Sequence, residues 1–248
     1  MVKPIIVKFG GSAITYKHKP FSLRKQVLYR LARELRASSA PLLLVHGGGS
    51  FAHPLAKRYQ KNLVAGFLEI HRAMERLNSK VMEALERARI PAISIPPSSF
   101  IRVRRGEIVK SEVSLIKWLL EKRIVPVTYG DIFPDNRGAC IVSGDKIVCH
   151  LAMRLHARLA IFCMDVDGIY IKEKDKMLLA SEFSFDDLSK LVELPTRVAD
   201  VTGGIREKIQ EALRLADTPT HVCFINGLKK GLLSRTLKGE RGLGTEIH

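Results

Sequence analysis

The sequence predicts an α/β fold built on a mainly parallel sheet, and two observations lead to that prediction. Short apolar runs suited to strands recur along the chain, and amphipathic helical patterns separate them. Such alternation is typical of βαβ units, in which helices cover both faces of a parallel sheet. The 248 residues, 46% of them hydrophobic, suffice for one large core. We expect one continuous sheet that carries two lobes, which meet near residues 158–160.

The predicted strands are the apolar runs Ile5–Val7, Leu42–Val45, Ala92–Ile95, Val125–Thr128, Leu159–Met164 and Val222–Ile225. The predicted helices cover residues 22–38, 69–88, 111–122, 145–157 and 205–216. Ser22 and Ser111 stand at the start of two of these helices, where a serine side chain often caps the first turn. Residues 100–110 and 130–142 break the alternation and are predicted to form hairpins.

The charge balance narrows the classes of partner. The chain carries 41 Lys and Arg against 25 Asp and Glu, a net charge of +16. A solvated basic surface and a general affinity for polyanions both fit this excess. The basic residues are spread along the chain without the motif of a known nucleic-acid-binding domain, so we expect no nucleic-acid partner.

The apolar runs and the cysteines indicate the cellular compartment of the protein. No window approaches the ~18 apolar residues of a membrane span, and the first residues have too short an apolar run for a signal peptide. We therefore expect a cytoplasmic protein without a membrane partner. The four cysteines are scattered without a C-x-x-C pair, so we expect buried free thiols in place of a metal cluster or disulfides.

Glycine-rich turns follow several predicted strands. KFGGS (8–12) follows the first strand, HGGGS (46–50) follows the second, and DVTGG (200–204) opens the last predicted helix. Ligands of parallel sheets gather at the carboxyl ends of the strands, and a glycine turn before a helix offers backbone N–H groups to an anion. The repetition predicts an anion site. Because GxxxxGK[ST], GxGxxG, HRD and DFG are all missing, phosphate chemistry must use another scaffold.

Eight motifs span the chain: KFGGSAIT (8–15), HGGGSFAH (46–53), HRAMERLN (71–78), VPVTYGD (125–131), SGD (143–145), MDVDGIY (164–170), DVTGGIREK (200–208) and GTEI (244–247). In order and spacing they resemble the amino acid kinase superfamily. The glycine triplet followed by Ser-Phe-x-His is similar to the isopentenyl phosphate kinase branch and to its relative, fosfomycin kinase. The resemblance implies an open αβα sandwich of one domain and a homodimer. Residues 1–159 would bind the phosphate acceptor and residues 160–248 would bind ATP.

The resemblance implies transfer of the γ-phosphoryl group of ATP to isopentenyl phosphate, which gives isopentenyl diphosphate for isoprenoid biosynthesis. A phosphate monoester is largely ionised near neutrality, because its second pKa is about 6. No general base is required, so catalysis should rest on positioning and positive charge. Mg²⁺ is expected with ATP. In this superfamily nucleotide oxygens hold the ion, so we name no protein ligand.

The same motifs imply the site residues. The expected catalytic residues are Lys8, Lys17, His53, Asp145 and Lys208. The expected acceptor site contains Gly47, Gly48, His53 and Gly144, and the expected ATP site contains Lys8, Gly10, Gly11, Ser12, Gly49, Asp165, Gly204 and Lys208. The lysines would contact phosphates, Asp145 would position the lysines, and His53 would donate a hydrogen bond to the acceptor phosphate. The N–H groups of residues 47–49 would face the phosphates, and Met74 and Leu77 would wall the pocket for the prenyl tail.

Three positions depart from the family pattern. Lys146 stands in SGDK where members commonly have a second acid, Ala52 replaces a frequent glycine, and Tyr16 precedes Lys17 where an acid is often found. Two other functions stay open. One is a kinase of the same fold for another acceptor, such as a phosphonate like fosfomycin, a different alkyl phosphate or a nucleoside monophosphate. The other is a non-catalytic protein that binds polyanions, for which the net charge is the only indication.

Overall fold

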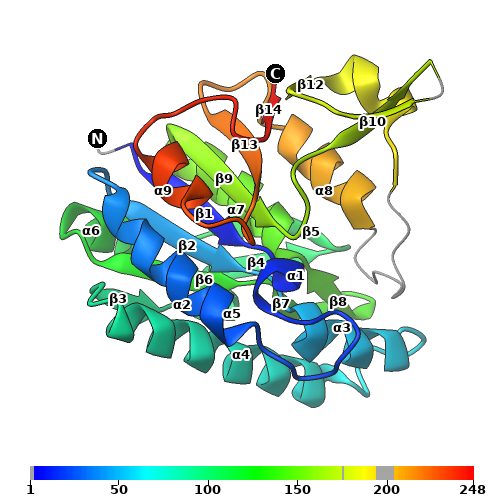
Figure 1. Ribbon diagram of the computed structural model, residues 1–248. Helices are drawn as coiled ribbons and strands as arrows, with labels where there is room; N and C mark the ends of the chain where they lie inside the picture. Colours follow the sequence, from blue (N-terminus) through cyan, green and yellow to red (C-terminus); the bar gives the residue numbers. More distant parts are fainter. Residues whose placement is uncertain (1–2, 175, 194–203) are drawn as a thin grey trace.

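The computed structural model describes residues 3–174, 176–193 and 204–248 (Figure 1). Its strands are β1 (Ile5–Phe9), β2 (Leu42–His46), β3 (Ala92–Ser94), β4 (Ile101–Arg104), β5 (Glu107–Ser111), β6 (Val125–Tyr129), β7 (Asp131–Asp135), β8 (Gly138–Val142), β9 (Leu159–Met164), β10 (Tyr170–Glu173), β11 (Lys176–Leu179), β12 (Glu182–Phe183), β13 (His221–Asn226) and β14 (Thr245–Ile247). Its helices are α1 (Gly11–Ile14), α2 (Lys25–Glu34), α3 (Gly49–Arg58), α4 (Phe67–Arg87), α5 (Pro97–Phe100), α6 (Ser114–Glu121), α7 (Gly144–Leu155), α8 (Gly204–Leu213) and α9 (Leu232–Leu237), with short 3-10 helices at Leu35–Ala37 and Phe185–Lys190.

One eight-stranded sheet runs through the described residues in the order β12-β14-β13-β9-β1-β2-β6-β3. Each neighbouring pair is parallel except β13 and β14. The predicted α/β fold is therefore confirmed, and each of the six predicted strands lies in this sheet with its ends shifted by at most two residues. The two predicted hairpins form as β4–β5 and β7–β8, and a third, β10–β11, was not predicted.

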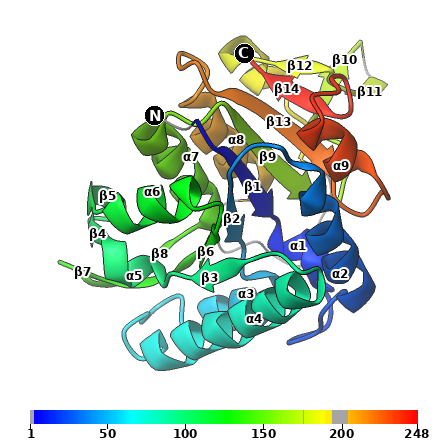
Figure 2. The ribbon, with the colours of Figure 1, turned by 90° about the vertical axis from the view of Figure 1, so that its left-hand side faces the viewer.

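Helices cover both faces of the sheet because its central strands are apolar on both sides. Successive side chains of a strand point to opposite faces. On β1, Ile5 and Val7 pack in the core beneath α2 and α4, whereas Ile6 packs in the core beneath α6, α7 and α8. Figure 2 shows α2 and α4 on one side of the sheet and α6 and α7 on the other. A strand buried on both faces reads in the sequence as a continuous apolar run.

The loops at the carboxyl ends of the strands pack backbone against backbone. A Cβ atom on Gly11 would lie 2.3 Å from the nitrogen of Gly49, so only glycine allows the β1–α1 and β2–α3 loops to meet. A Cβ atom on Gly144 would lie 3.1 Å from the carbonyl oxygen of His46 and 3.3 Å from Cε of Lys8. These glycines bring the starts of α1, α3 and α7 together at one edge of the sheet.

Two predicted helix starts are wrong. Ser22 does not cap α2, because its carbonyl oxygen accepts hydrogen bonds from the Tyr16 N–H and the Ser50 hydroxyl, and the helix begins three residues later. Ser111 pairs with Ile101 at the end of the β4–β5 hairpin. The helix α6 begins at Ser114, so the hairpin extends into the range that the sequence assigned to the helix. In the first case a segment 28 positions away in the chain contacts the backbone at the predicted start, and in the second case the neighbouring strand of the hairpin does.

The remaining expectations of this section concern thiols and membrane spans. All four cysteines are free thiols; Cys149, Cys163 and Cys223 are buried, and Cys140 is partly buried, close to what the sequence predicts. Over the part of the chain that the structure describes, none of the helices has the length and apolar character that crossing a membrane requires.

The contact between the two glycine loops gives a stability prediction. Gly11→Ala should lower the free energy of unfolding by about 3 kcal/mol, because the new methyl group overpacks against backbone that cannot move independently. Gly106→Ala is the control, since this glycine has no atom within 4 Å of the added Cβ and a φ of +74°. It should lose about 1 kcal/mol, the cost of a left-handed backbone alone. Urea unfolding measures the free energy of unfolding of both variants. Equal losses would show that the backbone around Gly11 moves to accommodate the methyl group at no cost.

Candidate active site

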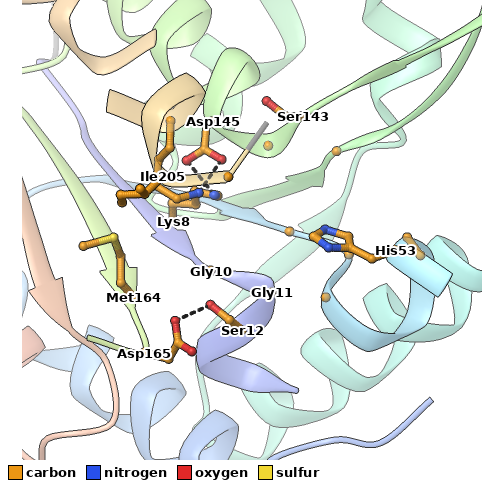
Figure 3. Close-up of a pocket in the computed structure, with 18 of the residues that line it drawn as sticks. Lys8, Gly10, Gly11, Ser12, His53, Ser143, Asp145, Met164, Asp165 and Ile205 are labelled. Carbon is orange, nitrogen blue, oxygen red and sulfur yellow. Dashed lines mark hydrogen bonds and ion pairs between the residues drawn. The ribbon is translucent and has the colours of Figure 1, made fainter. Parts of the chain in front are cut away.

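A cavity lies where β1, β2 and β9 end and α3, α7 and α8 begin (Figure 3). Every residue predicted to be catalytic or to bind the acceptor phosphate or ATP lines this cavity: Lys8, Gly10, Gly11, Ser12, Lys17, Gly47, Gly48, Gly49, His53, Gly144, Asp145, Asp165, Gly204 and Lys208. Residues 200–203 of the DVTGG motif lie outside the described residues. Parts of the chain up to 200 positions apart thus contribute to one site.

Two lysines share one carboxylate in this cavity. Lys8 on β1 places its Nζ 2.6 Å from Oδ1 of Asp145 (Figure 3), and Lys208 on α8 places its Nζ 2.9 Å from Oδ2. The side chains of Lys8 and Asp145 are almost completely buried, whereas that of Lys208 is 20% exposed. Asp145 lies in the first turn of α7, where the helix dipole also favours a negative charge. The arrangement gathers positive charge at the floor of the cavity.

The environment shifts both pKa values of the central pair. Burial, the largest influence, lowers the pKa of Lys8 to about 8, although the attraction of Asp145 opposes it. Burial acts to raise the pKa of Asp145, but the ammonium groups of Lys208 and Lys8 outweigh it and lower that pKa to about 2. Asp145 is therefore a permanent negative charge and no proton acceptor, and Lys8 loses its proton more readily than an ordinary lysine does.

A second charged group lies at the end of β9. The Ser12 hydroxyl donates to Oδ1 of Asp165 at 2.7 Å, and Nζ of Lys17 lies 2.9 Å from Oδ2. Burial acts to raise the pKa of Asp165, but Lys17 and Ser12 together hold it below the ordinary value. The Lys17 side chain is 39% exposed, in contrast to the buried Lys8. Lys17 is thus held at the rim of the cavity by a contact that solvent reaches.

The glycine triplet leads from β2 into α3. The N–H of Gly47 donates to the carbonyl oxygen of Phe9 at 3.0 Å, so the expectation that it faces a phosphate is wrong; it continues the ladder between β1 and β2. Gly48 and Gly49 form the cap and first residue of α3, where a helix leaves its first N–H groups without an intrahelical partner. His53 follows one turn later, and Figure 3 shows its ring directed into the cavity, toward the side that holds Lys8 and Asp145.

One side of the cavity is apolar. Met74 of α4 lines it, and its Sδ would lie only 2.9 Å from a Cβ atom on Gly48. Leu77 was expected to line it too, but this residue lies in the core under the sheet and does not reach the cavity. Helical periodicity cannot separate the two positions, because both are buried on the same side of α4. Ile70, also of α4, and apolar residues of α3 and β8 complete the wall: Ala52, Pro54, Ala56, Ile141 and Val142.

Sequence reasoning missed a buried acid at the apolar end. Asp131 begins β7 and lines the cavity, and its Oδ2 lies 2.7 Å from Nδ1 of His71 on α4. Burial raises the pKa of Asp131 to about 6, against the hydrogen bond from the Ile132 N–H and the nearby His71. Both residues belong to motifs that the sequence singles out, VPVTYGD and HRAMERLN, and this membership was the available signal.

Comparison with known proteins gives the family of this site. The model of the amino acid kinase family matches residues 3–226. The chain belongs to the amino acid kinase family. Within the family it is similar to the isopentenyl phosphate kinase of Methanothermobacter thermautotrophicus, with 38% identity over 98% of each chain. It is also similar to the isopentenyl phosphate kinase of Methanocaldococcus jannaschii, with 36% identity over 98% of this chain and 97% of that one.

The fold agrees with this assignment to the family. A solved structure of an isopentenyl phosphate kinase superposes with a TM-score of 0.85 and 34% identity, and the match covers 99% of this chain and 100% of the other. The likeness therefore includes both halves of the sheet and the loops that line the cavity. The resemblance to the amino acid kinase superfamily, found from the motifs, is confirmed.

The departures from the family pattern leave the cavity intact. Lys146 does not line it; its Nζ turns to Glu107, 2.7 Å away, in the β4–β5 hairpin. Tyr16 lies under the guanidinium group of Arg24, 4.3 Å from its ring centre, while Lys17 is held by Asp165. The Cβ of Ala52 fills the space where a side chain on Gly48 would stand, at 2.5 Å from its Cβ position. Each departure is therefore accommodated by a contact of its own.

The shared carboxylate gives a second stability prediction. Asp145→Asn should lower the free energy of unfolding by about 3–5 kcal/mol, because it leaves a buried ammonium group without its counter-charge. The double variant Lys8→Met/Asp145→Asn should recover part of the loss, since it removes the stranded charge as well. Asp167→Asn is the control: its partner Lys229 is 58% exposed, and such a pair is worth less than about 1 kcal/mol. Urea unfolding measures these losses. A loss for Asp145→Asn within about 1 kcal/mol of the loss for the control would contradict the role of Asp145 as the counter-charge of the buried lysine.

Proposed function

We propose that this chain transfers the γ-phosphoryl group of ATP to isopentenyl phosphate, giving isopentenyl diphosphate and ADP. One observation carries the proposal: a single cavity joins a cationic floor, made by Lys8 and Lys208 on Asp145, to an apolar wall around Met74. The floor suits two phosphate groups that repel each other, and the wall suits a short hydrocarbon tail. The isopentenyl phosphate kinases that match nearly the whole chain support the choice of acceptor.

The lysines do the electrostatic work of the proposed reaction. As the phosphoryl group transfers, negative charge spreads over its oxygens, and preorganised cations lower the barrier without having to reorient. Lys8 and Lys208 are preorganised in this sense because Asp145 fixes both ammonium groups. The acceptor phosphate attacks in its ionised form, so no residue is needed to remove a proton. Asp145, with its lowered pKa, acts only as a positioning residue.

Lys17 and His53 complete the proposed machinery. In the proposed complex Lys17 contacts the transferring phosphoryl group. To do so it leaves Asp165 and binds a phosphate oxygen, a movement that the partial exposure of its side chain permits. His53 donates a hydrogen bond to the acceptor phosphate, whose negative charge favours the protonated imidazolium. The first N–H groups of α3 and α7, at Gly48, Gly49 and Gly144, contact the phosphates between which transfer occurs.

The rest of the ATP site follows from the ends of β9 and α8. Gly10, Gly11, Ser12 and Asp165 lie on one side of the cavity and Gly204 begins α8 on the other, so we assign them to the nucleotide. Mg²⁺ is expected with ATP, and it would neutralise charge on the phosphates. Within the described residues no three His, Cys, Asp or Glu side chains are grouped to hold a metal ion, so nucleotide oxygens are the expected ligands.

Several features stay predictions from the family resemblance. We assign residues 1–159 to a lobe that binds the acceptor and residues 160–248 to a lobe that binds ATP, because the glycine triplet and Met74 lie in the first and Asp165 and Lys208 in the second. A homodimer and a cytoplasmic location are likewise inferred from the family and from the sequence.

A panel of acceptors tests the proposed activity. ADP release should be fastest with isopentenyl phosphate, and slower or absent with dimethylallyl phosphate, fosfomycin, UMP and acetylglutamate. His53→Ala should lower kcat/KM for isopentenyl phosphate by about 10- to 150-fold, the worth of a hydrogen bond to a charged group. His248→Ala, an exposed histidine at the far end of the chain, is the matched control and should have no effect. Preferred turnover of another acceptor would contradict the proposal while keeping the phosphoryl chemistry.

The lowered pKa of Lys8 gives a pH prediction. Because Lys8 acts as a cation and titrates near 8 in place of 10.5, kcat/KM should fall as the pH rises through about 8. Asp145→Asn removes an attraction that raises the pKa of Lys8, so the fall should move to lower pH. Asp167→Asn should leave the profile unchanged. A wild-type profile that stays flat to pH 9.5 would show that Lys8 keeps its proton.

A further inference from the structure

Two ion pairs cross between α7 and α8 in opposite directions. Lys208 on α8 reaches Asp145 on α7, and Lys146 on α7 lies 3.6 Å from Oε1 of Glu211 on α8. Asp145 and Lys146 are consecutive in α7, and Lys208 and Glu211 lie one turn apart on α8. The second pair therefore stands beside the first, one step farther from the cavity, with the two charges exchanged between the helices.

Lys146 also joins both helices to the β4–β5 hairpin. Its Nζ lies 2.7 Å from Oε1 of Glu107 and 3.1 Å from the carbonyl oxygen of Gly106. Arg214 completes the group, with its guanidinium 3.1 Å from Glu211 and 3.9 Å from Glu107. Two cations thus face two carboxylates. The side chains of Lys146 and Glu211 are only 19% and 17% exposed, so water screens their attraction less than it would at an open surface.

We propose that Lys146 is a positioning residue for phosphoryl transfer: it holds α8 against α7, so that Lys208 stays in register with Asp145 and Lys8. The proposal rests on the function proposed above. Asp145 alone does not hold Lys208 firmly, because its carboxylate also pairs with Lys8. A bound phosphate would also share the ammonium group of Lys208 with Asp145 and so weaken this pair. The contact between Lys146 and Glu211 does not involve the ligand, so it holds the helix when the first pair is loosened.

The same contacts account for the lysine in SGDK. An acid at position 146 would stand beside Glu107 and Glu211 and would be repelled by both. Lys146, Glu107 and Glu211 therefore form a matched set, and the departure from the family pattern is complemented on two other elements. Because a displacement of about 1 Å at a reacting group can cost a large factor in rate, the set acts on the reaction without touching the substrate.

Kinetics of neutral variants test the proposal. Lys146→Met should lower kcat by about 2- to 30-fold, the range for a residue that acts through another, with KM for isopentenyl phosphate within about twofold of wild type. Lys146→Arg keeps the charge and should restore most of the rate. Lys146→Met/Glu211→Gln should be no slower than Lys146→Met, because both changes break one interaction. Arg154→Met removes one positive charge from the exposed last turn of α7 and should match wild type.

Hydrogen exchange gives a reading that does not depend on turnover. In Lys146→Met the amides of α8, residues 204–213, should exchange faster than in wild type, whereas Arg154→Met should leave them unchanged. Wild-type kcat and wild-type exchange in Lys146→Met would overturn the proposal. So would additive losses in the double variant, or a loss that thermal unfolding explains entirely. A wild-type enzyme that ignores isopentenyl phosphate would instead contradict the proposed function, and the exchange comparison would still decide the role of Lys146.

Discussion

The whole site depends on one carboxylate that keeps two like charges close together. Lys8 and Lys208 lie 200 positions apart in the chain, and without Asp145 their ammonium groups would repel each other, that of Lys8 in a buried position. Each of the three lies on a different element of one rigid framework, namely β1, α7 and α8. The sheet order that places β9 and β2 on either side of β1 is what brings these elements to one edge. The sheet order that defines the fold is therefore also what keeps these three charged groups together.

Close packing of backbone is the second condition for that arrangement. The β1–α1 and β2–α3 loops meet where Gly11 and Gly49 lack side chains, and Gly144 lets α7 start directly beside His46 and Lys8. The result is that the starts of α3 and α7 point into the cavity together with the lysines. Positive charge, helix dipoles and N–H groups then act on the same small volume, which is where two phosphate groups would have to meet.

The strands were predicted well because apolar runs are a strong local signal, whereas the lining of the cavity was predicted from glycine clusters together with motifs whose order and spacing resemble the amino acid kinase family. Prediction from the sequence failed where a partner distant in the chain decides. The hydroxyl of Ser50, 28 positions away, donates to the carbonyl oxygen of Ser22, and the helix starts later than its cap signal indicates. Gly47 belongs to a glycine triplet but donates its N–H to Phe9. The pairing of Asp131 with His71 joins two motifs 60 positions apart, and no local pattern encodes such a contact.

The central place of β1 also matters for how the chain is made. Its neighbours β2 and β9 pair with it from very different separations along the chain: Ile5 pairs with Leu42 on one side and with Leu159 on the other. During synthesis β1, β2, β3 and β6 are all made by residue 129, before β9 begins at residue 159, so a half-sheet can form while β9 is still missing. Until β9 pairs with β1, one edge of an apolar strand is bare, and a bare edge can recruit a strand from another nascent chain. The strand that later carries Lys8 into the site is therefore also the point at which an unfinished chain most needs protection from aggregation.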